Sequence, residues 1–147
     1  MPGLLGLQHY KFGRTTTLPF PEKGYSPDSP YDMIAENLSR GLHTLVLLDI
    51  QADKGLLMTA NEGLGLLAGL ERRKGRGILG PEALVCVVAR AGSDSPVVRA
   101  GPLARLERED FGPPHHSIVV PGKLHFMEAE ALVELAGAPP GLVGKRG

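Results

Sequence analysis

Two apolar runs without alternation constrain the fold of this chain more than any other feature. Residues 43–50 read HTLVLLDI and residues 83–90 read ALVCVVAR, so neither run alternates apolar with polar side chains. A strand that leaves one face in water alternates with a period of two, whereas a continuous apolar run is typical of a strand buried on both faces. The two runs therefore predict a sheet that is covered by other elements.

A capped helix is predicted directly before the first of these strands. Ser29 can act as its N-cap, and Pro30 suits the first helical position because proline has no N–H to lose there. Gly41 follows as the C-terminal stop. Ile34 and Leu38 are four residues apart, so both would face the core.

A second helix is predicted to begin at the block MTANE, residues 58–62. Thr59 and Glu62 have the spacing of a capping box, in which each side chain satisfies a main-chain N–H of the other residue. Glycines 63, 65 and 69 lie inside this helix and each costs about 1 kcal/mol relative to alanine. The helix therefore needs support from tertiary packing.

The remaining pattern completes an α/β fold. Residues 14–20, 96–101 and 116–120 are predicted to be further strands, and residues 125–136 a final helix. Strands that alternate with helices favour a mixed β-sheet of about five strands covered by helices. A chain of 147 residues suits a single domain.

Composition excludes several classes of function. The 16 basic and 16 acidic residues balance, so no general field attracts nucleic acid or an acidic membrane surface. No stretch approaches the roughly 20 apolar residues of a membrane span. Cys86 is the single cysteine and sits in an apolar run, which predicts a small core residue and a reducing, cytoplasmic location. The sequence contains no G-x-S-x-G, no paired cysteines and no H-E-x-x-H, and no metal site is predicted.

A series of short blocks in fixed order carries a family resemblance. The blocks are HYKFGRTT (9–16), SPYDMIAENLSRGLHTLVLLDI (29–50), MTANE (58–62), VARAGS (88–93), VRAGPL (98–103) and HHSIVVPGKLHFMEAEAL (115–132). From about residue 6 to residue 138 the chain resembles the C-terminal half of the diphthine synthase family, within the tetrapyrrole-methylase-like methyltransferases. The N-terminal half of that family, with its Gly-Asp-Pro cofactor loop, has no counterpart in this chain.

The resemblance implies an enzyme that uses S-adenosyl-L-methionine. Members of the family methylate the amino group of the modified histidine of translation elongation factor 2 during diphthamide biosynthesis, and they are cytoplasmic homodimers. This chain, as half of such an enzyme, is expected to be inactive alone. Two alternatives stay open: a related tetrapyrrole or corrinoid methyltransferase domain, or a stand-alone half that binds a partner without catalysis. The stretch PHHSIVVPGKLHFMEAEA favours the protein-modifying branch.

Three residues match the cofactor contacts of the family: Leu48, Ala91 and His116. Each lies at the end or the start of a predicted strand, where main chain and small or apolar side chains could meet an adenosine. Without the resemblance they would be interpreted as a core leucine, a strand-end alanine and a structural histidine. The resemblance identifies no catalytic base.

Two further polar residues interrupt the apolar strands. Asp49 and Arg90 lie at the ends of the two runs, and a buried charged group usually pairs or has a function. Asp49 could belong to a substrate pocket or make a structural hydrogen bond. The two residues could pair with each other if their strands are neighbours.

Overall fold

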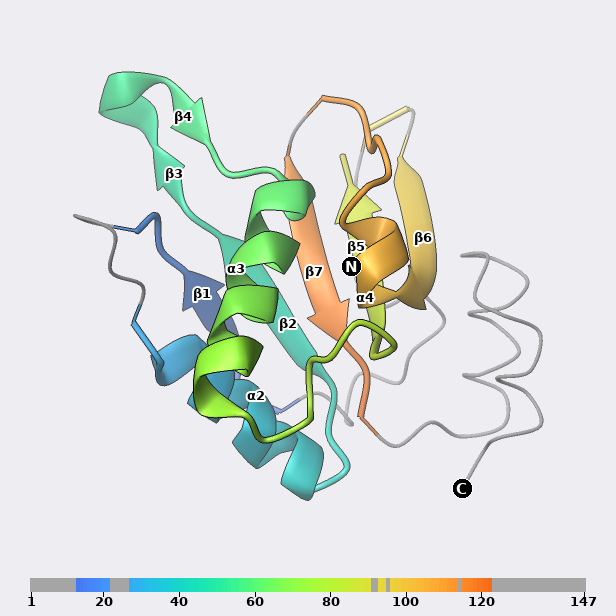
Figure 1. Cartoon of the computed structure of the whole chain (residues 1–147). Helices are drawn as coiled ribbons and strands as arrows, with labels where there is room; N and C mark the ends of the chain where they lie inside the picture. The colour runs from blue at the N-terminus through green and yellow to red at the C-terminus, as the bar shows by residue number, and fades with distance from the viewer. Residues whose placement is uncertain (1–12, 22–26, 91–92, 95, 114, 123–147) are drawn as a thin grey trace.

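A five-stranded mixed sheet forms the centre of the molecule (Figure 1). The computed structural model describes residues 13–21, 27–90, 93–94, 96–113 and 115–122. The sheet has the order β1-β2-β7-β5-β6. Its strands are β1 (Thr16–Leu18), β2 (Thr44–Leu48), β5 (Leu84–Ala89), β6 (Val97–Pro102) and β7 (His116–Val120). Strands β1 and β2 are parallel and the other neighbours are antiparallel, so the predicted mixed sheet is confirmed.

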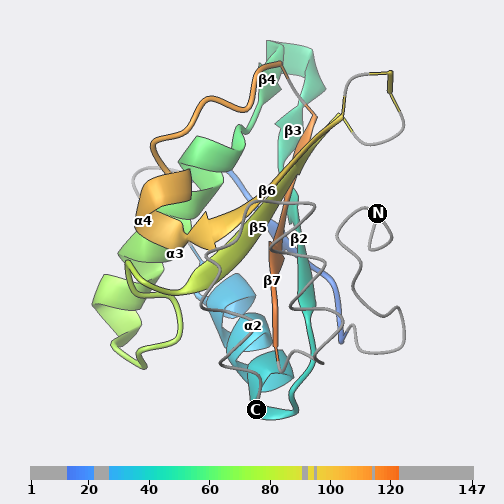
Figure 2. The same ribbon diagram turned by 90° about the vertical axis from the view of Figure 1, so that its right-hand side faces the viewer.

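The described helices lie on one face of this sheet (Figure 2). They are α2 (Ser29–Ser39), α3 (Ala60–Lys74) and α4 (Leu103–Leu106). Helix α2 connects the parallel strands β1 and β2, and α3 packs over β7 and β2. A separate two-stranded sheet of β3 (Ile50–Gln51) and β4 (Leu56–Leu57), joined by the 3-10 helix η2 (Ala52–Lys54), projects from the end of β2 (Figure 1).

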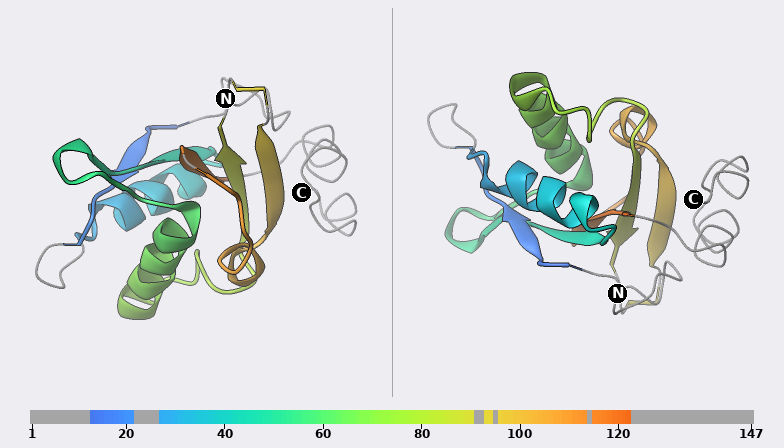
Figure 3. Two further views of the ribbon diagram at one scale, coloured as in Figure 1. Left: turned by 90° about the horizontal axis from the view of Figure 1, so that it is seen from above. Right: turned by 90° about the horizontal axis from the view of Figure 1, so that it is seen from below.

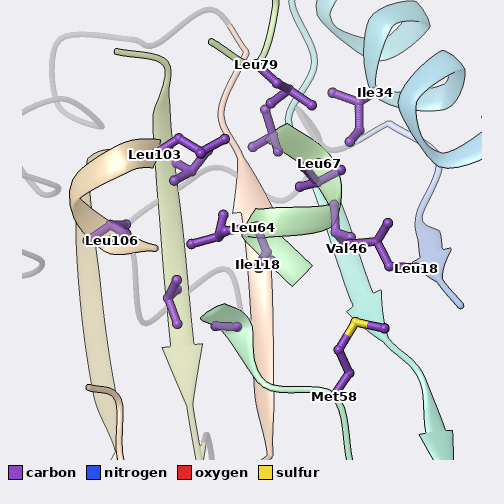
Figure 4. Close-up of a cluster of buried hydrophobic side chains, with 14 of the residues drawn as sticks. Leu18, Ile34, Val46, Met58, Leu64, Leu67, Leu79, Leu103, Leu106 and Ile118 are labelled. Carbon is purple, nitrogen blue, oxygen red and sulfur yellow. The ribbon is translucent and has the colours of Figure 1, made fainter. Parts of the chain in front are cut away.

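The hydrophobic core fills the space between the helices and this face of the sheet (Figure 4). Leu64 and Leu67 of α3 and Ile34 of α2 are fully buried against Val46 and Ile118 of the central strands. The sheet twists strongly, so that β1 and β2 lie at a large angle to β5 and β6 and the helices sit inside the curve (Figure 3). Leu64, Leu67 and Leu70 form the buried apolar side of α3.

Burial on the second face of the sheet differs between the two apolar runs. In β5 both faces are buried, since Cys86 and Val88 on the face away from the helices are 0% and 1% exposed. In β2 the prediction of two buried faces is wrong, because Leu47 is 41% exposed. Ile50 and Leu56 of the projecting sheet are also exposed, at 49% and 45%.

Two predicted element boundaries are corrected. Helix α2 has Asp28 rather than Ser29 as its N-cap, without a side-chain capping bond, because the Asp28 carboxylate pairs with Arg73 and Lys74. The strand expected over residues 43–50 breaks after Leu48, and Ile50 pairs with β4 instead. The capping box at Thr59 and the positive φ of Gly41 after α2 are as predicted.

Some predictions fall outside the described residues. The helix expected over residues 125–136 is one of them, and Ala91 is another. Within the described part of the chain, no helix has the length and apolar character that crossing a membrane requires.

Candidate functional site

One edge of the sheet brings together the strand ends at which the sequence predicted ligand contacts. Strands β1, β2 and β5 all run toward this edge, and β7 starts from it. The register pairs Leu47 with Ser117 and Ala89 with His116, so Leu48 and His116 lie side by side along the edge. We call the edge formed by Leu48, Ala89 and His116 the upper edge, because the end of β5 and the start of β7 point upward in Figure 1. Ligands of α/β sheets commonly bind outside the carboxyl ends of strands, which makes this edge the candidate site.

The His116 side chain is fully engaged within the protein. Its Nδ1 accepts a hydrogen bond of 2.9 Å from the main-chain N–H of Ala60, one of the orphan donors at the start of α3. Its Nε2 lies 3.0 Å from the Gly112 carbonyl and 3.2 Å from that of Pro113. The hydrogen bond from Ala60 to Nδ1 leaves Nε2 as the donor to these carbonyls, and the ring joins α3 to β7. Contact with a ligand at this position would therefore use the main chain of His116.

Leu48 lies beneath the first turn of α3. It is half-buried and packs against the core. A Cβ on Gly63 would come within 2.8 Å of Leu48 Cδ2 and 3.0 Å of Ile118 Cδ1, so a side chain at residue 63 would force these two side chains to move. Leu48 is thus partly a core residue, as the apolar run around it predicted. Part of its surface remains accessible at the upper edge.

Arg90 occupies the position between β5 and the predicted contact Ala91. Its φ of +53° is the single positive value among the described non-glycine residues. A left-handed conformation costs a residue with a side chain roughly 1–2 kcal/mol, and such strain often marks a functional region. Its main-chain N–H donates to the His115 carbonyl at 2.8 Å, which ties the end of β5 to the approach of β7.

A loop at the upper edge, residues 107–113, is held by the side chains of Asn61, Arg90 and His116. Asn61 Nδ2 donates to the Glu107 and Glu109 carbonyls at 2.9 and 2.6 Å. His116 and Arg90 hold the other end of the loop. Sequence reasoning used the block MTANE for its capping box alone and missed Asn61, whose partners are 46 and 48 residues away. No local spacing in the sequence indicates these bonds, because their partners are so distant along the chain.

The carboxylate of Asp49 has a structural role. Its Oδ2 accepts from the Phe20 N–H and its Oδ1 from the Ile50 N–H, both at 2.9 Å. It therefore holds the end of β1 beside the start of β3. The possible pair with Arg90 is excluded, because β7 lies between β2 and β5 and Arg90 Nη1 donates to the carbonyls of the 107–113 loop.

The two carboxyl groups with shifted pKa values, Glu71 and Asp28, lie away from the upper edge, near the C-terminal end of α3. Burial raises the pKa of the Glu71 carboxyl, but donors from four residues outweigh that effect and bring the pKa below its usual value. A hydrogen bond from Arg73 is the main cause of the lowered pKa of Asp28. Burial alone raises the pKa of Cys86 far above its usual range, so this thiol is an inert core group.

Among the described residues, no group of three or more His, Cys, Asp or Glu side chains could hold a metal ion.

The chemistry that the upper edge can perform is binding and orientation. Main-chain groups at strand ends, an accessible part of Leu48 and a rigidly held loop form a surface that could receive a flat ligand. Its histidine is committed to hydrogen bonds, as are Asp49 and Arg90. No nucleophile paired with a base is found among the described residues of this edge.

Comparison with known proteins connects the chain to one set of relatives. No protein-family model matches it. A diphthine synthase from Methanothermobacter thermautotrophicus is 54% identical over 142 residues, which are 97% of this chain and 54% of that protein. A diphthine synthase from Methanocaldococcus jannaschii is 54% identical over 132 residues, covering 88% of this chain and 51% of the relative. The chain spans about half the length of the curated relatives it matches.

Solved structures give the same result. A crystal structure of diphthine synthase superposes with a TM-score of 0.84 at 34% identity, over 97% of this chain and 52% of that one. A putative diphthine synthase from Entamoeba histolytica gives a TM-score of 0.88 at 30% identity, over 94% and 56%. The resemblance predicted from the sequence and the predicted fold class are thereby confirmed.

Proposed function

We propose that this chain is the C-terminal half of a diphthine synthase, a methyltransferase that uses S-adenosyl-L-methionine. The enzyme methylates the amino group of the modified histidine of translation elongation factor 2 in diphthamide biosynthesis. The observation that carries the proposal is 54% identity over 97% of the chain to a diphthine synthase. Since the chain spans 54% of that relative, the activity belongs to the whole enzyme rather than to this half alone.

The cofactor would lie against the upper edge, with Leu48, Ala91 and His116 as its contacts from this half. S-adenosyl-L-methionine supplies a methyl group that is already activated by the sulfonium, so the protein chiefly binds, orients and excludes water. The accessible apolar part of Leu48 suits an adenosine. The committed ring of His116 leaves its main chain for the ligand and favours a rigid site. No residue of this half is assigned as the base that removes the proton from the amine.

The partners follow from the same proposal. The protein substrate is elongation factor 2, the active form is a homodimer, and the enzyme acts in the cytoplasm, where translation takes place. The exposed Leu47, Ile50 and Leu56 support the expectation that further polypeptide packs against this half in the complete enzyme.

The test compares the chain alone with the same chain fused to the N-terminal half of the Methanothermobacter relative. We expect calorimetric titration with S-adenosyl-L-methionine to give a dissociation constant above about 10 μM for the chain alone, because half of the pocket is missing. The fused protein should bind at least tenfold more tightly. Affinity tighter than about 10 μM for the chain alone would contradict a half-site.

Substrate identity is tested with the fused protein. After incubation, mass spectrometry should find added methyl groups on elongation factor 2 that carries the carboxypropyl-histidine, and none on a tetrapyrrole. The control is elongation factor 2 with the unmodified histidine, which should gain none. Methylation of the tetrapyrrole alone would assign the chain to the related branch, and no methylation of either would favour a non-catalytic half.

A further inference from the structure

Arg90 is placed where its main chain and its side chain act on two different segments of the upper edge. Its main-chain N–H bonds the His115 carbonyl, and its carbonyl accepts from the Ser93 N–H at 3.0 Å. The positive φ turns the chain directly after β5. Glycine adopts such a φ without cost, so an arginine at this position implies that the side chain is needed.

The guanidinium reaches across to the 107–113 loop. Nη1 donates to the Phe111 carbonyl at 2.9 Å and to the Pro113 carbonyl at 2.6 Å. Between these two carbonyls Gly112 has a φ of +75°, and a Cβ there would come within 2.9 Å of Arg90 Nη1. A side chain at residue 112 would therefore displace the guanidinium from its present position.

His116 holds the same part of the loop from the other side. Its Nε2 faces the Gly112 and Pro113 carbonyls, and the Phe111 ring packs edge-on against its ring, at a centroid distance of 6.0 Å. The carbonyls of three successive residues, 111–113, are thus taken up by Arg90 and His116. Arg90 directly precedes the predicted contact Ala91 in the sequence, and His116 is itself a predicted contact.

We propose that Arg90 is a positioning residue of the cofactor site, which clamps the 107–113 loop against the end of β5. The clamp fixes the end of β5, at Ala89 and Arg90, relative to the start of β7 at His116, whose main chain would contact the ligand. This role rests on the proposed function and adds to it a residue that acts through others rather than by touching the substrate.

Three variants test the role. Arg90→Gly removes the guanidinium and also relieves the left-handed φ, Arg90→Lys keeps a cation that can donate to both carbonyls, and Arg99→Ala is the control. Arg99 is exposed on β6, and its Nη1 bonds the carbonyl of the adjacent Val98. Thermal unfolding of the 147-residue chain monitors stability, and hydrogen exchange of the peptide covering residues 107–116 monitors the clamp.

We expect Arg90→Gly to speed exchange of that peptide at least tenfold with a melting temperature within a few degrees of wild type. In the fused protein it should weaken S-adenosyl-L-methionine binding at least tenfold, Arg90→Lys should recover part of the affinity, and Arg99→Ala should change neither. Unchanged exchange in Arg90→Gly overturns the clamp. Faster exchange in Arg90→Gly with wild-type affinity for S-adenosyl-L-methionine overturns the role in the site. The role is also overturned if Arg90→Gly loses affinity only because it unfolds and Arg90→Lys loses the same amount. A wild-type fusion that fails to bind refutes the proposed function itself, independently of the exchange result.

Discussion

The Glu71 carboxylate accepts hydrogen bonds from the main-chain N–H groups of three successive residues, Gly77, Ile78 and Leu79, at 2.9, 2.8 and 2.7 Å. It also accepts from the Tyr31 phenol at 3.0 Å, which links α3 to α2. Leu79 is 1% exposed, so this one side chain directs the loop after α3 into the core. A carboxylate that accepts several N–H bonds is stabilised in its charged form.

The first prediction is that Glu71→Gln destabilises the protein by about 1–3 kcal/mol at neutral pH, because charge-assisted bonds to the loop are lost. The folded-state pKa lies below its ordinary value of 4.5. Its contribution is therefore present above pH 4.5 and is lost as the pH falls through the folded value. Urea unfolding at a series of pH values should show the variant and wild type converging in acid.

The matched control for this prediction is Glu36→Gln. Glu36 pairs with Arg40 at 3.1 Å on the exposed side of α2, where an ion pair contributes little. Its stability at neutral pH should stay within about 0.5 kcal/mol of wild type. A Glu71→Gln curve that runs parallel to wild type at all pH values would show that the carboxylate charge is not what holds the loop.

At the same scale, sequence patterns revealed local partners and missed distant ones. The Thr59 and Glu62 box is predictable because its members are three residues apart. His116 was singled out by resemblance, yet its bond to Ala60 spans 56 positions and no spacing rule indicates it. The Arg90 bonds to residues 111 and 113 were missed for the same reason.

Helix α3 shows how an element can need a residue that weakens it. Three glycines lie within it, and only tertiary contacts distinguish them. A Cβ on Gly63 would meet Leu48 and the fully buried Ile118, whereas on Gly69 the nearest atom would be Arg72 Nη2 at 3.7 Å, an ordinary contact. Gly63 therefore sets the distance between α3 and the sheet, and Gly69 only lowers helix propensity.

The second prediction uses this contrast within one helix. Gly69→Ala should stabilise the protein by up to about 1 kcal/mol through helix propensity. Gly63→Ala gains the same propensity but forces Leu48 and Ile118 apart, and overpacking typically costs about 1–3 kcal/mol, so we expect no gain or a net loss. Urea unfolding of both variants measures the difference. Equal stabilisation by the two substitutions would mean that the strands yield freely beneath α3.

Element boundaries were predicted least well where tertiary contacts override local signals. Ser29 has the right chemistry for an N-cap, but α2 begins after Asp28 and the Asp28 carboxylate is drawn to the cations at the end of α3. The break after Leu48 arises because Asp49 bonds two main-chain N–H groups at the end of β1 and the start of β3. The contacts of Asp28 with Arg73 and of Asp49 with Phe20 span 45 and 29 positions, which is farther than a local pattern reaches.

At the scale of the whole molecule, β7 joins two units that are otherwise separate in the sheet. Strands β1 and β2 form one unit with α2, and β5 and β6 form an antiparallel pair. Strand β7 pairs with β2 on one side and with β5 on the other. The sequence predicted a mixed sheet of about five strands, but apolar runs carry no information about strand order.

The third prediction follows from this position. Ile118→Val in β7 should destabilise the protein by about 0.5–1.5 kcal/mol, since the side chain is fully buried. Hydrogen exchange should speed up by the same factor in β1–β2 and in β5–β6, about fivefold for 1 kcal/mol. Ile50→Val is the same chemical change at a 49% exposed site outside the five-stranded sheet and should have little effect. Faster exchange confined to one unit would show that the two units unfold independently.

The central position of β7 also has a consequence for biosynthesis. It is the last described strand to leave the ribosome, yet β2 and β5 each pair with it along one side. Until residues 116–120 emerge, β2 and β5 each present an open edge of main-chain N–H and C=O groups beside apolar side chains. Such edges readily pair with other chains. The nascent protein is therefore most prone to aggregate in the interval before its middle strand is synthesised, and that interval is when a ribosome-associated chaperone would protect it best.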